Sequence, residues 1–167
     1  QVLGTLTLTG SAGPGIGDAY MDFTDLSAPI ITNTTSITGG ASANGSRAYI
    51  DVTNATTGNL LLQAPGGLNL TGGTNNANNE ARLWAGAGVT INPVGNVQII
   101  ANAATAYIRA GSGPMSITST GSYTLTGGST TAAHAEMFSG STTDLTLSGV
   151  NMTLTSLGGG AGPTYPY

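Results

Sequence analysis

The segment that decides the fold is "LTGGTNNANNEARL", residues Leu70–Leu83. It starts with an aliphatic residue and the triplet Thr-Gly-Gly, passes through a polar stretch, and ends on alanine, any residue and a large aliphatic. The same order returns in Ile37–Ile50 and Leu125–Met137. Two copies without the full triplet contain the "AYM" of Ala19–Met21 and the "AYI" of Ala106–Ile108. An internal repeat of this kind governs the fold of the whole chain.

The repeat has a mean spacing of 29 residues, because its alanines are residues 19, 48, 81, 106 and 135. One copy divides into "AYIRA" (106–110), "MSITS" (115–119) and "YTLTGG" (123–128), with Gly- and Ser-rich breaks between them. Alternating apolar residues predict half-buried strands. Three strands per unit predict an all-β fold, a single parallel β-solenoid of about five to six coils. The alternative, a β-sandwich of hairpins, would not repeat one residue pattern at every third strand.

Two longer segments, "GNLLLQAPGGLNLTGG" (58–73) and "AGAGVTINPVGNVQIIANAA" (85–104), carry a family resemblance. They resemble the repeats of filamentous-haemagglutinin-type secreted bacterial surface proteins, and the resemblance covers about Gly4–Gly160. It implies a right-handed, pectin-lyase-like β-helix and an extracellular setting. The chain begins at Gln1 with no basic-then-apolar leader, which we interpret as a mature product after removal of a signal peptide. We therefore expect a protein that is secreted and lies outside the cell or on its surface.

Composition excludes several function classes. Charged residues make up only 6 % of the chain, against roughly 25 % in ordinary soluble domains. The net charge is −4 and the three basic residues are all arginines, so a nucleic-acid partner is not expected. No apolar run is long enough for a membrane span. The absence of Cys excludes disulfides and thiolate metal sites.

The strand alternation assigns the charges to one outer face. With Ala81 and Leu83 pointing inward, Glu80, Arg82 and Trp84 point outward. The same phase in all five units gives a column of outward residues, here called the outer ladder, which holds eight of the ten charges. Its members are Asp18, Tyr20, Asp22, Arg47, Tyr49, Asp51, Glu80, Arg82, Trp84, Tyr107, Arg109, His134, Glu136 and Phe138.

Stacking of the coils predicts contacts within the outer ladder. The expected contacts are an alternating-charge series of Asp18, Arg47 and Glu80, a stack of Tyr20 on Tyr49, and Arg82 against Tyr49 and Tyr107. One interpretation is that the ladder fixes the register of the coils and keeps one face hydrated. The other is a contact surface for a neighbouring subunit, a neighbouring filament or a glycan. The excess of arginine and aromatic residues without lysine favours protein contact.

Catalytic and metal-binding patterns are weak. Asp22 and Asp51 are expected about 5 Å apart, the carboxylate spacing of a retaining glycosidase, but short coils leave no loops to build a cleft. The "GPGIGDAYMDFTD" segment is similar to a calcium-binding nonapeptide at Asp18, Asp22 and Asp25, yet it occurs once, without neighbouring copies. His134 has no partner at metal-ligand spacing. We expect no enzyme activity, no metal and no cofactor.

Two surface patterns suggest further alternatives. Thr-x-Thr recurs in 5–9, 124–126 and 153–155, as in ice-binding solenoids, but Ser36, Asn69 and Gln98 interrupt the column. Glycosylation sequons occur at Asn33, Asn44, Asn54, Asn69 and Asn151. Since threonine is a good strand residue and sequons arise by chance in a Ser/Thr-rich chain, neither pattern decides the function.

The ends of the chain suggest self-assembly. We divide it into an N-terminal strand (1–9), which is a candidate for donation to a neighbouring subunit, a solenoid (10–157) and a Gly/Pro/Tyr tail (158–167). The strands "VLGTLTLT" and "MTLTSL" both match the third strand of a unit, so the count is five coils plus one strand. The residues expected at the polymerisation ends are Val2, Leu3, Leu6, Leu8, Leu154, Leu157, Tyr165 and Tyr167.

Open solenoid ends favour head-to-tail contacts that do not close. The sequence therefore predicts a structural subunit of an extracellular fibre, whose partners are copies of itself and, laterally, neighbouring filaments or glycans. The alternative is a glycan- or surface-binding module of an adhesin. An ice-binding protein and a polysaccharide-degrading enzyme are less favoured alternatives.

Overall fold

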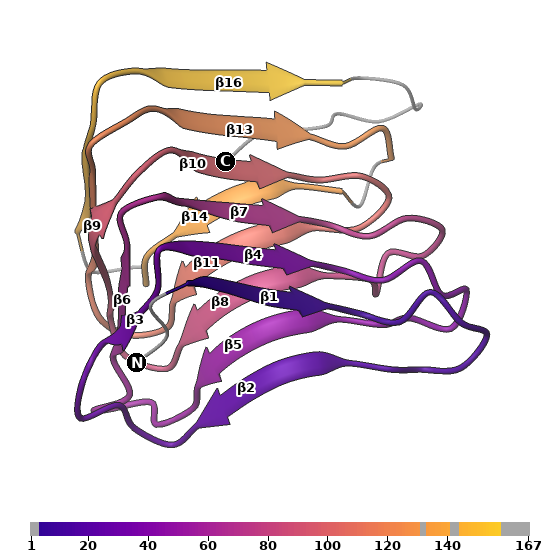
Figure 1. Cartoon of the computed structure of the whole chain (residues 1–167), viewed down its shortest axis with the longest axis horizontal. Coiled ribbons are helices and arrows are strands. Elements are labelled where there is room, and N and C mark those ends of the chain that lie inside the picture. The colour runs from indigo at the N-terminus through magenta and orange to yellow at the C-terminus, as the bar shows by residue number, and fades with distance from the viewer. Residues whose placement is uncertain (1–3, 131–132, 141–143, 158–167) are drawn as a thin grey trace.

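The computed structural model describes residues 4–130, 133–140 and 144–157, and these residues wind into a parallel β-solenoid (Figure 1). Sixteen strands form three sheets, called A, B and C in winding order, and every strand pair in them is parallel. The all-parallel pairing confirms the solenoid and excludes the sandwich of hairpins. None of the described residues forms a helix that is long and apolar enough to cross a membrane.

Each sheet is a stack of strands that are equivalent in successive coils. Sheet A contains β1 (Thr5–Thr9), β4 (Thr34–Thr38), β7 (Gly67–Thr71), β10 (Val97–Ile100), β13 (Tyr123–Gly127) and β16 (Met152–Ser156). Sheet B contains β2 (Ala19–Phe23), β5 (Ala48–Val52), β8 (Ala81–Ala85), β11 (Ala106–Ala110) and β14 (Ala135–Phe138). Sheet C contains β3 (Ile30–Ile31), β6 (Leu60–Ala64), β9 (Val89–Val94), β12 (Met115–Ser119) and β15 (Leu145–Ser148).

The register follows the repeat read from the sequence. The five signature alanines are paired from coil to coil in sheet B, and the large aliphatics two residues later are paired in the same way. Both β1 and β16 lie in sheet A with the third strands of the units. The described residues thus make five coils plus one strand, as the sequence predicts. The β1 strand pairs with β4 of its own subunit.

The core is a continuous column of small and aliphatic side chains that point inward from the three sheets. Ile50, Leu83 and Ile108 of sheet B are fully buried, as are Leu70 and Leu125 of sheet A. Burying one such side chain contributes about 1.5–3 kcal/mol. No coil can bury its own apolar face, so this stabilisation depends on the coils above and below.

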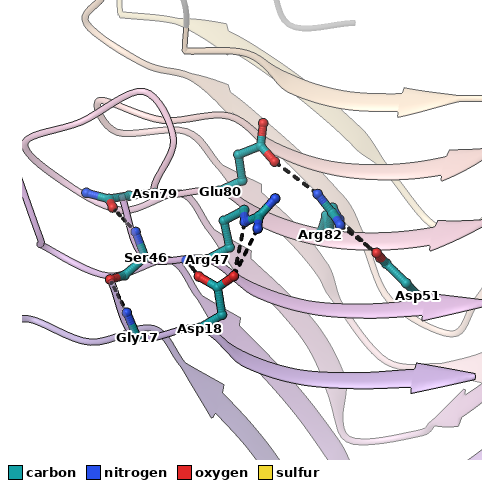
Figure 2. Close-up of polar contacts among 8 residues, drawn as sticks. All are labelled: Gly17, Asp18, Ser46, Arg47, Asp51, Asn79, Glu80 and Arg82. Carbon is teal, nitrogen blue, oxygen red and sulfur yellow. Dashed lines mark hydrogen bonds and ion pairs between the residues drawn. The ribbon is translucent and has the colours of Figure 1, made fainter. Parts of the chain in front are cut away.

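The Thr-Gly-Gly triplets form the corners between sheets A and B. A Cβ atom on Gly39 would clash with the backbone of Asn79, and one on Gly73 would clash with the backbone of Gly40. The close approach of successive coils therefore requires glycine here. Asn79, which is fully buried, accepts a hydrogen bond on Oδ1 from the Ser46 backbone N–H at 2.6 Å (Figure 2). Ser46 in turn accepts from the Gly17 N–H on its hydroxyl at 3.1 Å.

Asn79→Ala is expected to lower the free energy of unfolding by about 1–2 kcal/mol, because it leaves the buried Ser46 N–H without its acceptor. The Asn79 Nδ2 also donates to the Ser42 carbonyl at 2.9 Å, and that bond is lost as well. Asn78→Ala is the matched control, since Asn78 is exposed in the same corner. Urea unfolding of both variants measures the difference, and equal midpoints would contradict this role for Asn79.

Two features of the fold were not visible in the sequence. β9 extends from Val89 to Val94 through a bulge at Asn92–Pro93, where the register against β6 and β12 shifts. Tyr123 points inward and is only 2 % exposed. Its hydroxyl lies 2.8 Å from the carbonyls of both Ile117 and Ser148, so one buried phenol bridges two coils.

Candidate functional site: the outer ladder of sheet B

The outer ladder lies on one face, as the alternation predicts. Its fourteen residues belong to sheet B or stand directly before its strands, and three columns run up the coils. The first column contains Asp18, Arg47, Glu80 and His134, with Thr105 between the last two. The second contains Tyr20, Tyr49, Arg82, Tyr107 and Glu136. The third contains Asp22, Asp51, Trp84, Arg109 and Phe138.

The N-terminal part of the ladder has two of the expected contacts. Arg47 forms an ion pair with Asp18, with Nη2 3.0 Å from Oδ2, and its backbone N–H donates to Oδ1 of the same carboxylate at 2.8 Å (Figure 2). Tyr20 and Tyr49 stack with their ring centroids 5.2 Å apart and their planes 11° from parallel. Both contacts join the first coil to the second.

The centre of the ladder differs from the expected charge series. Glu80 does not continue the series to Arg47. It forms an ion pair at 3.3 Å with Arg82, which lies two residues further along the chain. The physical reason is that Arg82 is anchored nearby, with Nη2 2.5 Å and Nε 3.1 Å from the two oxygens of Asp51 (Figure 2). This bidentate bond is the strong arrangement for an arginine and a carboxylate. Arg82 also lies over the Tyr49 ring, 4.5 Å from its centroid, as expected.

Asp51 lies on the outer ladder as expected, but its side chain is buried there. Asp22 and Asp51 are neighbours in register, and Asp22 is exposed, but Asp51 is only 6 % exposed and held by Arg82. Among the described residues no group of three His, Asp or Glu side chains could hold a metal ion. Asp18 is paired with Arg47, and Asp25 accepts hydrogen bonds from Asn54 and Thr57.

The electrostatics of the centre keep Arg82 charged and its tyrosine neighbours neutral. Burial alone would lower the pKa of Arg82, but the hydrogen bonds that it donates to Asp51 and its electrostatic interactions with Tyr107, Asp51 and Glu80 raise it overall. Burial also raises the pKa of Tyr107, the Glu80 charge adds to this, and Arg82 opposes it. The pKa of Tyr49 is raised by burial and then by Asp18, against Arg47.

Stability is expected to fall as the pH rises above about 10, the ordinary pKa of tyrosine. The raised pKa values of Tyr49, Tyr107 and the buried Tyr123 mean that the folded chain keeps protons that the unfolded chain releases. The favourable contribution is therefore complete below about pH 10 and is lost as pH rises through the folded-state pKa values. Urea unfolding midpoints measured at about pH 8 and about pH 11 test this. The fall in midpoint between the two pH values should be smaller in Tyr107→Phe than in the unchanged chain. A midpoint that rises with pH would contradict it.

The C-terminal part of the ladder is more open. Arg109 is exposed and lies over the Phe138 ring, 5.0 Å from its centroid. Trp84 and Arg109 line a shallow hollow of about 240 Å³, together with Asp51, Arg82 and Tyr107. In the described part of the chain Arg109 forms no ion pair, whereas Arg47 and Arg82 each do. Glu136 lies beside Tyr107 in register, and the backbone N–H of His134 faces the Thr105 hydroxyl at 3.5 Å.

The threonine columns and the sequons lie elsewhere. Thr7, Ser36, Asn69, Gln98 and Thr124 are in register on the outer face of sheet A, so the column is interrupted where the sequence indicates. A hollow of about 420 Å³ opens over Asn69 and Gln98. Among the sequon asparagines, three are exposed and two are half-buried: Asn33, Asn44 and Asn151, against Asn54 and Asn69.

Several residues expected at the polymerisation ends are visible. Leu6 and Leu8 pack on the core but are only partly buried, while Leu154 and Leu157 are 52 % and 51 % exposed. Val2, Leu3, Tyr165 and Tyr167 lie outside the described residues, as does the tail. The visible end residues thus belong to the outermost strands of the solenoid or directly follow them.

Comparisons with protein-family models, curated proteins and solved structures gave no match to this chain. The fold therefore stands on the strand pairing, which makes it a β-helix repeat protein of five coils. Its function has to be argued from the surfaces described above.

Proposed function

We propose that this chain is a structural subunit of an extracellular fibre and polymerises head to tail through the two ends of its solenoid. The supporting observation is that, among the described residues, both ends of the solenoid present unpaired strand edges with core-type side chains. The N-terminal pole consists of β1, β2 and β3, and the C-terminal pole of β14, β15 and β16. Each of these strands pairs with one strand only among the described residues, so its other edge has no described strand partner.

The inward side chains at the two poles are incompletely covered. At the C-terminal pole Leu145 and Met152 are 42 % and 50 % exposed, whereas Leu125, one coil below Leu154, is fully buried. At the N-terminal pole Met21, Phe23 and other inward residues are only partly buried. Among the described residues no helix covers either pole. An open edge of this kind is a template for pairing with another chain.

A second copy of the chain has the right pattern to continue the stack. If β2 of a neighbour lay on β14 in the register of the repeat, Ala19 would lie on Ala135 and Met21 on Met137. These are the pairings that the signature makes inside the molecule, as in Ala106 with Ala135. A contact between two different surfaces repeats without closing and gives filaments.

The outer ladder is then a lateral surface along the side of the fibre. Its N-terminal and central contacts, through Arg47 and Arg82, bind coil to coil and keep the register. Arg109 and Trp84 at the open hollow are available to a neighbouring filament or a glycan. We also propose that the chain is related to filamentous-haemagglutinin-type repeats, that it is secreted, and that it lies at the cell surface.

The alternative function is a glycan- or surface-binding module of an adhesin, favoured by the same hollow of Trp84, Tyr107 and Arg109. Trp, Tyr and Arg are the residues enriched at the energetically dominant positions of protein interfaces. An adhesin module would bind its ligand as a monomer, whereas a fibre subunit assembles without any ligand.

Leu145→Lys tests the proposal. A lysine at this inward position of the C-terminal edge opposes strand addition, so we expect fibres from the unchanged chain and none from the variant. Thr146→Lys adds the same charge to the same strand on its outward face and should still assemble. Analytical ultracentrifugation and negative-stain microscopy of the three proteins decide between the outcomes. A wild-type chain that stays monomeric, or equal assembly of both variants, would overturn the proposal.

A further inference from the structure

The three sheets do not contain equal numbers of strands. Among the described residues sheet A has six strands, while sheets B and C have five each. Sheet A is therefore one strand longer than each of the other two sheets, and its outermost strands are β1 and β16. Figure 1 shows β1 and β16 at the two ends of the sheet A stack. This mismatch restricts how a second copy can continue the solenoid.

A neighbour has to dock in the same rotational setting for its sheets to continue. The corners are unequal: two residues separate β3 from β4, whereas nine separate β4 from β5. A neighbour turned by one sheet would place long corners over short ones. Sheet A must therefore continue sheet A, and likewise for sheets B and C.

Two junctions satisfy this condition. In the first, here called the six-step junction because successive subunits are six strand spacings apart, the neighbour's β1 lies on β16. Sheet A then continues without interruption. Sheets B and C each lack one strand at the junction, so the strands on either side of the gap are about 10 Å apart. In the five-step junction, the neighbour's β2 lies on β14 and its β3 on β15, and both sheets continue without a gap. The neighbour's β1 and the first subunit's own β16 then compete for the same edge of the first subunit's β13. The five-step junction adds two strand pairings to the separate subunits, and the six-step junction adds one.

The two competing strands are interchangeable in sequence. Residues 6–9 read Leu-Thr-Leu-Thr and residues 152–155 read Met-Thr-Leu-Thr. In the register of sheet A, Leu6 corresponds to Met152 and Leu8 to Leu154, both inward, and the threonines correspond on the outer face. Either strand therefore presents side chains of similar size and polarity to the neighbouring strand β13.

The strand that is displaced from sheet A should be the one whose inward side chains lose less burial. The inward side chains of β16, Met152 and Leu154, are 50 % and 52 % exposed. Those of β1, Leu6 and Leu8, pack against the core. We infer that β1 of each subunit displaces β16 of the preceding subunit from β13, an inference that rests on the proposed fibre. One strand of sheet A then joins two subunits, pairing with β4 of its own and β13 of its neighbour.

Cysteine pairs distinguish the junctions, because the chain has no cysteine of its own. Strand exchange places Thr7 of one subunit beside Thr124 of the next, in the position that Thr153 holds otherwise. Within one subunit β1 and β13 are four strand spacings apart, about 19 Å, which is beyond the reach of a disulfide. The double variant Thr7→Cys/Thr124→Cys, oxidised under assembly conditions, should give a ladder of covalent multimers on non-reducing gels.

Two further pairs report the other arrangements. Thr7→Cys/Thr153→Cys joins subunits only in the six-step junction, and Ser36→Cys/Thr153→Cys only if β16 displaces β1. Each single-cysteine variant should stop at the dimer. Microscopy of the same samples separates strand exchange from fibre assembly. If fibres form but the covalent ladder comes from either of these two pairs, or from none of the three pairs, strand exchange is wrong and the fibre proposal is unaffected. An absence of fibres in the unchanged protein overturns the proposed function itself.

Discussion

Replacing Leu83 by alanine is expected to lower the free energy of unfolding by about 2–5 kcal/mol, the range for removing a large aliphatic side chain from a packed core. Leu83 is fully buried at the middle coil, between Ile50 and Ile108 in register. The cavity would lie between coils, and neither neighbour can move to fill it without leaving its own strand position. The effect should therefore fall in the upper part of the range.

Urea unfolding followed by circular dichroism measures this change. Thr90→Ala is the control, because Thr90 is exposed on β9, and surface changes of this kind stay within about 0.5 kcal/mol. A Leu83 variant as stable as this control would mean that the inward assignment of sheet B is wrong.

Replacing Asp51 by alanine is expected to cost about 2–3 kcal/mol, because it leaves the Arg82 guanidinium without its bidentate partner. The side chain of Arg82 is 17 % exposed and keeps the Glu80 contact, so the loss stays below that of a fully buried charge. Asp22→Ala is the matched control, since Asp22 precedes Asp51 in the same column and is exposed.

A double variant sharpens the Asp51 experiment. Asp51→Ala combined with Arg82→Met removes both charges and should be more stable than Asp51→Ala alone. Thermal or urea unfolding of the four proteins gives the coupling between the two sites. If the double variant loses the sum of the single losses, the ion pair is not what makes Asp51 important.

The sequence predicts the sheets of this protein because the repeat carries its own register. The alanine signature places Ala48 on Ala81 and on the next coils, and period-two alternation then fixes which side of each strand faces the core. The prediction that Tyr20 stacks on Tyr49 follows from the same register, since equal spacing in adjacent coils brings equal positions together.

Side-chain partners are harder to predict than strand positions. Arg82 has Tyr49 and Tyr107 beside it in register, but its guanidinium reaches the diagonal Asp51, and this choice draws Glu80 away from Arg47. A long flexible side chain selects among several carboxylates within reach, and the repeat does not encode that choice. Tyr123 is a similar case, because its role depends on two carbonyls from other strands.

Electron microscopy of the purified chain tests whether subunits assemble through the solenoid poles. We expect fibres with a strand spacing of about 4.8 Å along the axis and a subunit repeat of about 24 Å, five strand spacings. A chain that remains monomeric at all concentrations, or fibres whose strands do not run across the axis, would contradict it.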